Sequence, residues 1–481
     1  MIDDELDVRD FARQFRAFLE KVHRALPDVE PSELNRRMAE HLGADPAALP
    51  VVTEALPPYE LANIQAAMDA YLARPEVTAE LIGIAGGGRE HQGFADLVAA
   101  ARHGSYDVGA VDYSTVAIGV GRERACVSFG LYLIAEGARR YAALVRLSGH
   151  RQGMPELLIE VLGTDPDATR AFLRTIRDLA VRHHVARGQV LSFEPHVYGH
   201  GIGPLRFHER PHVDAADVIL PAGVLDSVHR QVTGVAEHRE RLLAAGHHLK
   251  RGVVLFGPPG TGKTLTVRHL IGAQPDATVV VLTGLGLQFI REACNLARLL
   301  PPAVVVLEDV DLVAEERDHS PLGGGNPLLF QLLNEMDGVA GDADIAFLLT
   351  TNRLDLVEPA LTQCPGRVDL VVEVPLPDEA ARQRLLTLYG VSAHLTPEEV
   401  DRVVAATAGT TGSFFSELAR RAELLAATAG DDRAGLRHIV AALDELGRSR
   451  AAVAGAVARR DRSAPPAAGR PAAGPGLAPY D

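Results

Sequence analysis

The sequence predicts an α/β fold, in which a doubly wound parallel sheet with a phosphate-binding loop is followed by a helical lid and preceded by an α+β region. Three observations predict it. A glycine-rich stretch, Gly257–Thr264, lies between a buried apolar run and a helix-compatible run. From residue 217 onward, apolar runs alternate with helical stretches, as they do in parallel sheets. Upstream, residues 112–147 contain β-rich runs separated by turn residues, which indicates an antiparallel meander.

The composition is that of a globular protein. The chain has 481 residues, of which 47% are hydrophobic and 23% charged, and its formal net charge is −15. This length suits about three domains. The negative charge argues against nucleic acid held by general electrostatics, so nucleic acid is an unlikely ligand and proteins are the expected partners.

The cysteines and the apolar runs predict a cytoplasmic protein. Cys126, Cys294 and Cys364 are far apart and odd in number, which favours reduced thiols over disulfides. The acidic first residues lack the apolar core of a signal peptide. No apolar run reaches the roughly 20 residues that span a bilayer, and the run Ala125–Leu147 is interrupted by charges. No membrane contact is expected.

The front half is expected to contain two parts. Apolar residues at helical spacing predict a helical region over residues 1–78. Residues 79–194 are expected to form an α+β domain that binds a client or adaptor protein. Its elements would be three meander strands, a helix and a closing strand, at Asp112–Val120, Ala125–Ala135, Tyr141–Leu147, Ala168–Val185 and Gln189–Phe193. Residues 195–216 are rich in Pro and Gly and predict a linker.

Two features of the front half predict no chemistry. Gly86-Gly87-Gly88 is read as a flexible loop, because no Lys-Ser/Thr pair follows it. Several histidines scatter over helix, loop and linker, and we interpret their spacings as matching no metal-binding motif. They are His183, His184, His196, His200, His208 and His212.

The glycine-rich stretch predicts a nucleotide-binding loop at the start of residues 217–376, the expected nucleotide-binding domain. Its glycines allow backbone N–H groups to converge on phosphates, and the start of the following helix adds partial positive charge. Lys263 is placed to reach the β- and γ-phosphates, and the Thr264 hydroxyl to bind Mg²⁺. The expected binding residues are Gly257, Pro258, Pro259, Gly260, Thr261, Gly262, Lys263, Thr264 and Leu265.

Polar side chains follow two later strands of the predicted sheet. Strands are expected at Ala277–Leu282, Ala303–Leu307, Ile345–Thr350 and Leu370–Val374. The second continues into Glu308-Asp309-Val310-Asp311, where one carboxylate can hold the Mg²⁺ shell through water and the next can polarise the attacking water. Glu308 is the expected metal-side acid and Asp309 the expected water activator.

Two further residues complete the predicted catalytic set. Asn352 follows the strand that ends in Thr350-Thr351, where its amide could contact the γ-phosphate or the attacking water. Arg367 precedes the last strand, and an arginine there can reach a neighbouring subunit's γ-phosphate and stabilise the transition state.

Over about residues 215–447 the chain resembles the AAA family of the AAA+ ATPases. The motifs that carry the resemblance occur in the family's order: GPPGTGKT, LEDVD, LLNEMDG, TTN, PALTQCPGRVD and Gly409-Thr410-Thr411-Gly412. The resemblance implies that Lys263 and Thr264 bind ATP with Mg²⁺, that Asn352 is the first sensor and that Arg367 is an arginine finger. It also implies that Asp337-Gly338 lies in the intersubunit signalling region and that Gly412 lies near the adenine, in a helical lid over residues 377–447. The implied assembly is a ring, usually a hexamer, that remodels proteins.

Three departures from the family pattern bear on this function. The acidic pair is Glu308-Asp309, whereas the family usually has Asp-Glu. The region after Thr283 is shorter than in threading unfoldases, and Phe289 there is expected to pack in the core rather than grip substrate. Cys364 stands where a second arginine is common. The Glu-Asp order, the short region after Thr283 and the GRVD sequence are together most similar to the branch that contains the mitochondrial chaperone inserting the Rieske protein, but without its transmembrane segment.

Two functions remain open at this stage. The first is an oligomeric ATPase that couples hydrolysis to remodelling, unfolding or translocation of a protein client. The second is an ATP-gated scaffold with little turnover, which the acid order and Cys364 favour. A DNA-dependent ATPase fits poorly with the net charge. Residues 448–481, rich in Ala, Pro, Gly and Arg, are expected to be disordered.

Overall fold

The computed structural model describes residues 14, 15, 18, 21, 30–148, 156–195, 202–311, 331, 334–336, 343–355 and 368–448. The chain divides into two compact units. The first unit comprises Met1–His212, His229–Val254 and Leu270–Val371, and the second comprises Val213–Val228, Leu255–His269 and Val372–Asp481. Each contains its own buried core.

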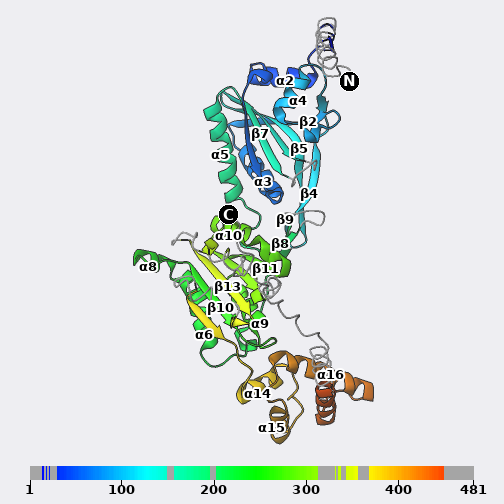
Figure 1. The fold of residues 1–481 in the computed structure, drawn as a ribbon, viewed down its shortest axis with the longest axis vertical. Coiled ribbons are helices and arrows are strands. Elements are labelled where there is room, and N and C mark those ends of the chain that lie inside the picture. The colour runs from blue at the N-terminus through cyan, green and yellow to red at the C-terminus, as the bar shows by residue number, and fades with distance from the viewer. Residues whose placement is uncertain are drawn as a thin grey trace, which may run out of the picture. The chain divides into compact units, whose positions relative to one another are not determined.

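The front of the first unit is built on a seven-stranded sheet, labelled in Figure 1. The strand order is β1-β7-β6-β5-β2-β3, and β4 pairs with β5. These neighbours are antiparallel. The strands are β1 Val51–Leu56, β2 Val77–Ala85, β3 Asp107–Gly109, β4 Asp112–Gly119, β5 Arg122–Glu136, β6 Arg139–Leu147 and β7 Leu157–Gly163. The predicted meander is therefore confirmed as β4, β5 and β6.

Helices cover both faces of this sheet because its central strands are apolar on both sides. Leu131 and Leu133 of β5 join a cluster with α2 (Glu33–Leu42) and α4 (Phe94–Ala101). Tyr132 and Ile134 face the other way, into a cluster with α3 (Leu61–Leu72) and α5 (Pro166–Arg182). The predicted helix at residues 168–185 corresponds to α5.

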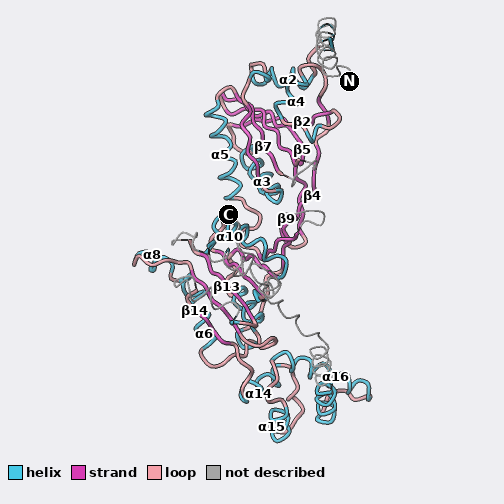
Figure 2. Tube along the Cα trace, in the orientation of Figure 1, coloured by secondary structure: helices cyan, strands magenta, loops and turns pink. Residues whose placement is uncertain are grey.

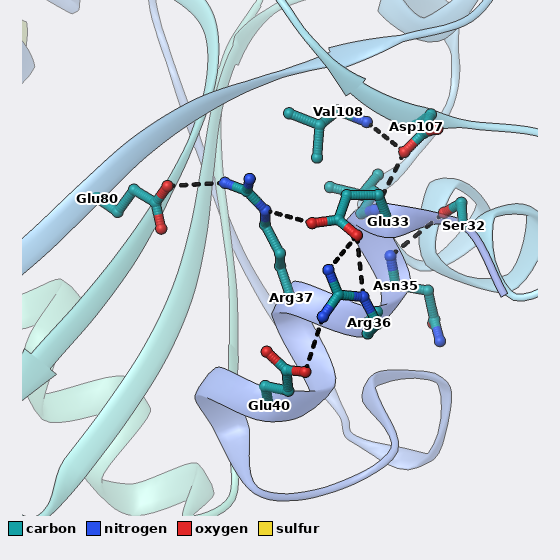
Figure 3. A network of polar contacts seen from close by, with 10 residues as sticks. Ser32, Glu33, Asn35, Arg36, Arg37, Glu40, Glu80, Asp107 and Val108 are labelled. Atoms are coloured by element: carbon teal, nitrogen blue, oxygen red, sulfur yellow. Dashed lines mark hydrogen bonds and ion pairs between the residues drawn. The ribbon is translucent and has the colours of Figure 1, made fainter.

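A polar network fixes the start of α2 (Figure 3). The Ser32 hydroxyl accepts the Asn35 N–H at 3.3 Å, and Asp107 Oδ1 accepts the Leu34 N–H at 3.3 Å. These acceptors satisfy amides that the helix leaves unpaired. Arg37 of the same helix donates to both Glu33 and Glu80 at 2.8 Å, which ties α2 to β2.

The second sheet also has seven strands, in the order β14-β10-β13-β12-β11-β8-β9. The pairs β8–β11, β11–β12 and β12–β13 are parallel, and β9 runs antiparallel to β8. The strands are β8 Val190–Pro195, β9 Ile202–His208, β10 Arg251–Phe256, β11 Thr278–Thr283, β12 Ala303–Glu308, β13 Ile345–Thr351 and β14 Leu370–Glu373. The four strands predicted after the loop are confirmed as β11 to β14, and the predicted α/β fold with a parallel sheet is confirmed.

Three predictions for the front half are wrong. The strand expected at Gln189–Phe193 exists, but it pairs with β11 of the second sheet, with Val279 opposite Val190, instead of closing the front sheet. Residues 202–208 of the predicted linker form β9. The region predicted to be helical before residue 78 also contains β1, the partner of β7. For β8 and β1, pairing with a distant strand decides the structure, whereas β9 forms a hairpin with β8.

Helices alternate with the strands of the second sheet along the chain, and Figure 2 colours the helices cyan and the strands magenta. These helices are α6 Val224–His229, α7 Val235–Glu237, α8 Arg239–Ala244, α9 Lys263–Gly272 and α10 Ile290–Leu299. A π-helical turn, Arg230–Gly234, joins α6 to α7. A 3₁₀ turn, Gly284–Phe289, leads from β11 into α10.

The lid forms the core of the second unit. Its helices are α14 Glu379–Leu388, α15 Pro397–Ala406 and α16 Gly412–Ala429, and residues 436–448 are also helical. Thr396 and Glu399 form a reciprocal capping box at the start of α15. Phe415 and Leu418 of α16 are buried among the other lid helices, and Ile219 packs against the same cluster. Among the described helices, none is both long and apolar enough to cross a membrane.

Candidate active site

The glycine-rich loop has the backbone that close approach to phosphates requires. β10 is buried at Val253–Leu255, and the chain then turns at Gly257, whose φ is 146°. A Cβ there would lie 2.2 Å from the carbonyl oxygen of Val374. Gly260 has a φ of 79°, and its Cβ would lie 2.3 Å from Ser413 Oγ. Side chains are thus excluded at both positions, which keeps the loop backbone open to a ligand.

Lys263 stands at the first position of α9 and is 6% exposed. Its Nζ donates to the carbonyl oxygens of Gly257 at 2.7 Å and Pro258 at 3.0 Å, so the ammonium group lies within the loop. Thr261 Oγ1 donates to the Pro258 carbonyl at 2.9 Å. Thr264 follows on the helix, half-buried. A buried cation, a helix start and a neighbouring hydroxyl form a donor set that fits a nucleotide phosphate with Mg²⁺.

The lid contacts this loop through the start of α16. The Ser413 N–H donates to the Gly260 carbonyl at 3.0 Å, and Gly412 begins the helix beside it. A Cβ on Gly412 would lie 3.3 Å from the same carbonyl. The structure therefore places Gly412, a predicted binding residue, directly against the phosphate loop.

The acidic residues lie at the ends of β12 and β13. Glu308 is the last residue of β12, and Asp309 follows with a φ of 51°, a left-handed conformation that is uncommon outside glycine. The Asp309 N–H donates to Thr350 Oγ1 at 3.0 Å. Asn352, just beyond β13, has its Nδ2 at 3.3 Å from Asp309 Oδ1. The structure thus brings together Asp309 and Asn352, two of the residues for which the sequence predicts catalytic roles.

One residue of this cluster had no predicted role. Asp311, 4% exposed, accepts hydrogen bonds from Thr351 Oγ1 and from the Asn352 N–H, both at 3.0 Å. The sequence marks it only as the last acid of the run that begins at Glu308. Its position depends on contacts with residues some 40 positions later, which local sequence cannot reveal.

Several predicted residues lie outside the described part of the chain. They are Asp337, Gly338, Cys364 and Arg367. Phe289, by contrast, is described and 6% exposed in the core, 6.1 Å from the ring of Phe193, which confirms that it packs rather than projects.

These features define a nucleotide-binding α/β domain with a helical lid. Residues 253–376 match the model of the ATPase family associated with various cellular activities, AAA. This stretch is therefore an AAA ATPase domain, and such a domain uses ATP with Mg²⁺ and hydrolyses ATP.

Three relatives illustrate the similarity beyond the family model. The chain is 34% identical to the ATP-dependent zinc metalloprotease FtsH of Mycoplasmopsis pulmonis over 209 residues, 41% of this chain and 29% of the relative. It is 32% identical to FtsH 1 of Symbiobacterium thermophilum over 333 residues, 64% and 55% of the two chains. It is 33% identical to YME1L of Drosophila melanogaster over 227 residues, 45% and 30%. The chain thus spans about half or less of these relatives' lengths.

The chain contains a string that bears on the zinc metalloprotease names of these relatives. His208-Glu209-Arg210-Pro211-His212 has the letters of the zinc-binding HExxH motif, so our interpretation that the histidine spacings match no motif was wrong. That motif binds zinc when a helix places both histidines on one face. Here His208 ends β9, residues 209–212 are irregular, and Arg210 is anchored to the carbonyls of Gly188 and Ala277. Within the described ranges, no group of three or more His, Cys, Asp or Glu residues could hold a metal ion.

Proposed function

We propose that the chain is an oligomeric AAA ATPase that couples ATP hydrolysis to remodelling, unfolding or translocation of a protein client. The observation that carries the proposal is the loop in which Lys263 is buried at the start of α9 and the start of α16 is bonded to Gly260. A loop contacted by the lid in this way can transmit the state of the nucleotide to the lid helices.

Each site residue has a proposed role. The loop, with Lys263, binds the phosphates of ATP, and Thr264 and Glu308 hold Mg²⁺, the latter through water. The metal supplies charge neutralisation at the phosphates when it is bound. Asp309 polarises the attacking water, Asn352 orients it, and Arg367 acts on the site of the next subunit. Gly412 lies by the nucleotide as part of the lid.

The front domain is the proposed client- or adaptor-binding part. Its connection to the ATPase sheet supports this assignment, because β8 follows α5 after a short connection, residues 183–189, and pairs with β11. Phe193 of β8 contacts Tyr59 of the front region at a ring separation of 5.8 Å and Phe289 before α10 at 6.1 Å. The ring of Phe193 thus links the front region to the turn after β11, and this chain of contacts can carry a displacement of that turn into the front domain.

The turn after β11 is a second candidate for client contact. Leu285 is 75% exposed, more than any other large hydrophobic residue of the described chain, and it stands between Gly284 and Gly286. Because Thr283 pairs with Glu308 in the parallel register, this turn leaves the sheet at the edge where the acidic residues lie. The aromatic residue of this turn, Phe289, is buried, so Leu285 would make the contact with the client.

The finer assignments are proposals as well. The assembly would be a ring, usually a hexamer in this family. The location would be cytoplasmic, without contact with a membrane or with nucleic acid. The resemblance to the branch of the Rieske-protein chaperone rests on the acid order and the short turn after β11, whereas the relatives found by comparison are zinc metalloproteases.

The alternative is an ATP-gated scaffold with little turnover. It is favoured by the order Glu308-Asp309, because the shorter acid stands where the water activator belongs. The contact between Asn352 and Asp309 gives that acid a fixed partner on β13's side of the site. The two functions differ in the rate of ATP hydrolysis. A rate on the order of one ATP per second for each subunit would exclude the scaffold.

The test is steady-state ATP hydrolysis as a function of protein concentration, with oligomer size measured in parallel. The wild type, Arg367→Ala and a control, Arg402→Ala, are compared; Arg402 is 68% exposed on α15. We expect specific activity to rise with assembly and to fall in Arg367→Ala alone. Activity independent of assembly, or unchanged by Arg367→Ala, would refute active sites completed between subunits.

A further inference from the structure

The turn that follows β12 brings a second carboxylate back to the end of β13. Asp309 has a left-handed backbone, and its N–H donates to Thr350 Oγ1. A backbone of this kind changes the chain direction within one residue. Two residues later Asp311 reaches the residues that follow Thr350. Asp309 and Asp311 therefore both face the end of β13.

Asp311 is a buried carboxylate held by hydrogen-bond donors. Its Oδ1 accepts from Thr351 Oγ1 and from the Asn352 N–H, each at 3.0 Å, and its Oδ2 lies 3.4 Å from Asn352 Nδ2. Among the described residues it forms no ion pair. A buried carboxylate without a cation is costly unless donors surround it. The cost is met here by three donors, two of which belong to Asn352.

These contacts determine both the place and the orientation of the Asn352 amide. The bond to its N–H fixes the backbone, while Asp309 Oδ1 at 3.3 Å and Asp311 Oδ2 at 3.4 Å flank its Nδ2. Carboxylate oxygens accept and do not donate, so the amide nitrogen faces the two acids. The amide oxygen is thereby turned away from them.

We propose that Asp311 is a positioning residue for ATP hydrolysis, which acts by holding Asn352 against Asp309. The inference rests on the proposed hydrolytic function, and it adds a residue to which the sequence assigned no role. Asp311 does not touch the reacting atoms in this proposal. Its removal should slow the chemical step and leave nucleotide binding by the loop intact.

The most informative variant is Asp311→Asn. The new amide oxygen can still accept from the Asn352 N–H and Thr351 Oγ1, so the backbone stays in place. The new amide nitrogen would then face Asn352 Nδ2, and two donors cannot bond to each other. If the Asn352 amide rotates to present its oxygen to the new amide nitrogen, those two groups can bond, but Asp309 loses its donor. The variant thus disturbs the orientation of one amide within a preserved fold.

The test is a double-mutant cycle in the full-length protein with Asp311→Asn, Asn352→Ala and the two combined. Values of kcat and KM for ATP, the Kd for ADP and the unfolding midpoint are measured for each. We expect Asp311→Asn to lower kcat at least tenfold, with KM and the Kd within threefold. The combined variant should fall no further than about twofold below Asn352→Ala, since coupled residues are not additive.

Two further variants separate positioning from stability. Asp344→Asn alters a carboxylate that is equally buried, 2% exposed, at the opposite end of β13, where it pairs with Arg251. It should lower the unfolding midpoint and leave kcat within twofold. Thr351→Val, which removes one donor to Asp311 and keeps the shape, should lower kcat about threefold, and it tests the same idea if Asp311→Asn does not fold.

The possible outcomes are distinguishable. Wild-type turnover with an unchanged Asp311→Asn, or losses that multiply in the combined variant, would overturn the role of Asp311 and leave the ATPase assignment intact. Absence of hydrolysis in the wild type would overturn both.

Discussion

Gly260 offers a direct test of the contact between the phosphate loop and the lid. Its φ of 79° and the 2.3 Å separation that an added Cβ would have from Ser413 Oγ both exclude alanine. The left-handed backbone costs an alanine about 1–2 kcal/mol. Ser413 can rotate its hydroxyl away only by giving up its 3.1 Å contact with Thr411 Oγ1, a loss of about 0.5–1.5 kcal/mol. We expect Gly260→Ala to cost about 2–3 kcal/mol in total.

This cost should appear as weaker nucleotide binding, because the loop must keep its conformation to hold phosphates. A penalty of 2–3 kcal/mol corresponds to an about 30- to 150-fold rise in the Kd for ADP, at 1.4 kcal/mol for each tenfold. Titration of the purified protein with a fluorescent ADP analogue measures the Kd, and urea unfolding shows whether part of the cost falls on stability instead.

The double variant separates the two contributions. Ser413→Ala removes the hydroxyl, after which a Cβ at residue 260 meets Thr411 Oγ1 at 3.2 Å and Cβ of residue 413 at 3.3 Å. Gly260→Ala with Ser413→Ala should therefore recover about tenfold of the lost affinity, with the backbone cost remaining. Gly435→Ala, a lid position with no atom within 4 Å of the added Cβ, is the matched control. A Gly260→Ala protein with unchanged Kd and unchanged stability would refute the loop–lid geometry.

Three other predictions follow from buried groups. Arg251→Met leaves the 3%-exposed side chain of Asp344 without its 2.7 Å partner and should lower the free energy of unfolding by about 3–5 kcal/mol. Arg251→Met combined with Asp344→Leu should lower it less, because no buried charge is then left unpaired. Equal losses for the two variants in urea denaturation would contradict this. Burial raises the pKa of the Cys294 thiol to about 12. A protein with Cys294 as its sole cysteine should therefore react with a thiol reagent at pH 8 only after unfolding. Rapid labelling of the native protein would show that α10 is not packed. Burial lowers the pKa of His208, so as pH falls the imidazole is protonated in the unfolded chain at a higher pH than in the folded protein. The contribution of His208 to stability should therefore be full above pH ~6.5 and decrease as pH falls below that value. Urea midpoints measured at pH 8 and pH 5.5 should show a smaller loss for His208→Gln than for the wild type.

The parallel strands could be located from sequence because each is buried on both faces. β12 and β13 therefore read as uninterrupted apolar runs with clear ends. The hairpin β8–β9 carries Pro and Gly, and its place in the sheet depends on pairing with β11, some 90 residues later. The strand β1 lies between two helices and depends on β7, more than 100 residues later. Local pattern carries no information on such partners.

The site divides in the same way. Lys263, Thr264 and the loop glycines form one continuous segment, so local sequence alone supports the prediction of a phosphate-binding loop there. Asp309 and Asn352 were each predicted at the end of a strand, and the pairing of β12 with β13 makes those two ends neighbours. The role of Asp311 depends on hydrogen bonds to Thr351 and Asn352 that form only when β12 and β13 lie side by side. The lid contact at Ser413 likewise joins residues about 150 positions apart.

Steady-state hydrolysis of ATP by the wild type, Lys263→Ala and Arg268→Ala tests the central claim most directly. Arg268 is exposed on the same helix, α9, and its loss controls for a general effect of removing a cation near the loop. We predict that the wild type and Arg268→Ala hydrolyse ATP at similar rates and that Lys263→Ala loses at least 100-fold, because the buried ammonium group is the loop's cation for the phosphates. Equal turnover in Lys263→Ala, or none in the wild type under conditions where it binds ATP and assembles, would contradict the account.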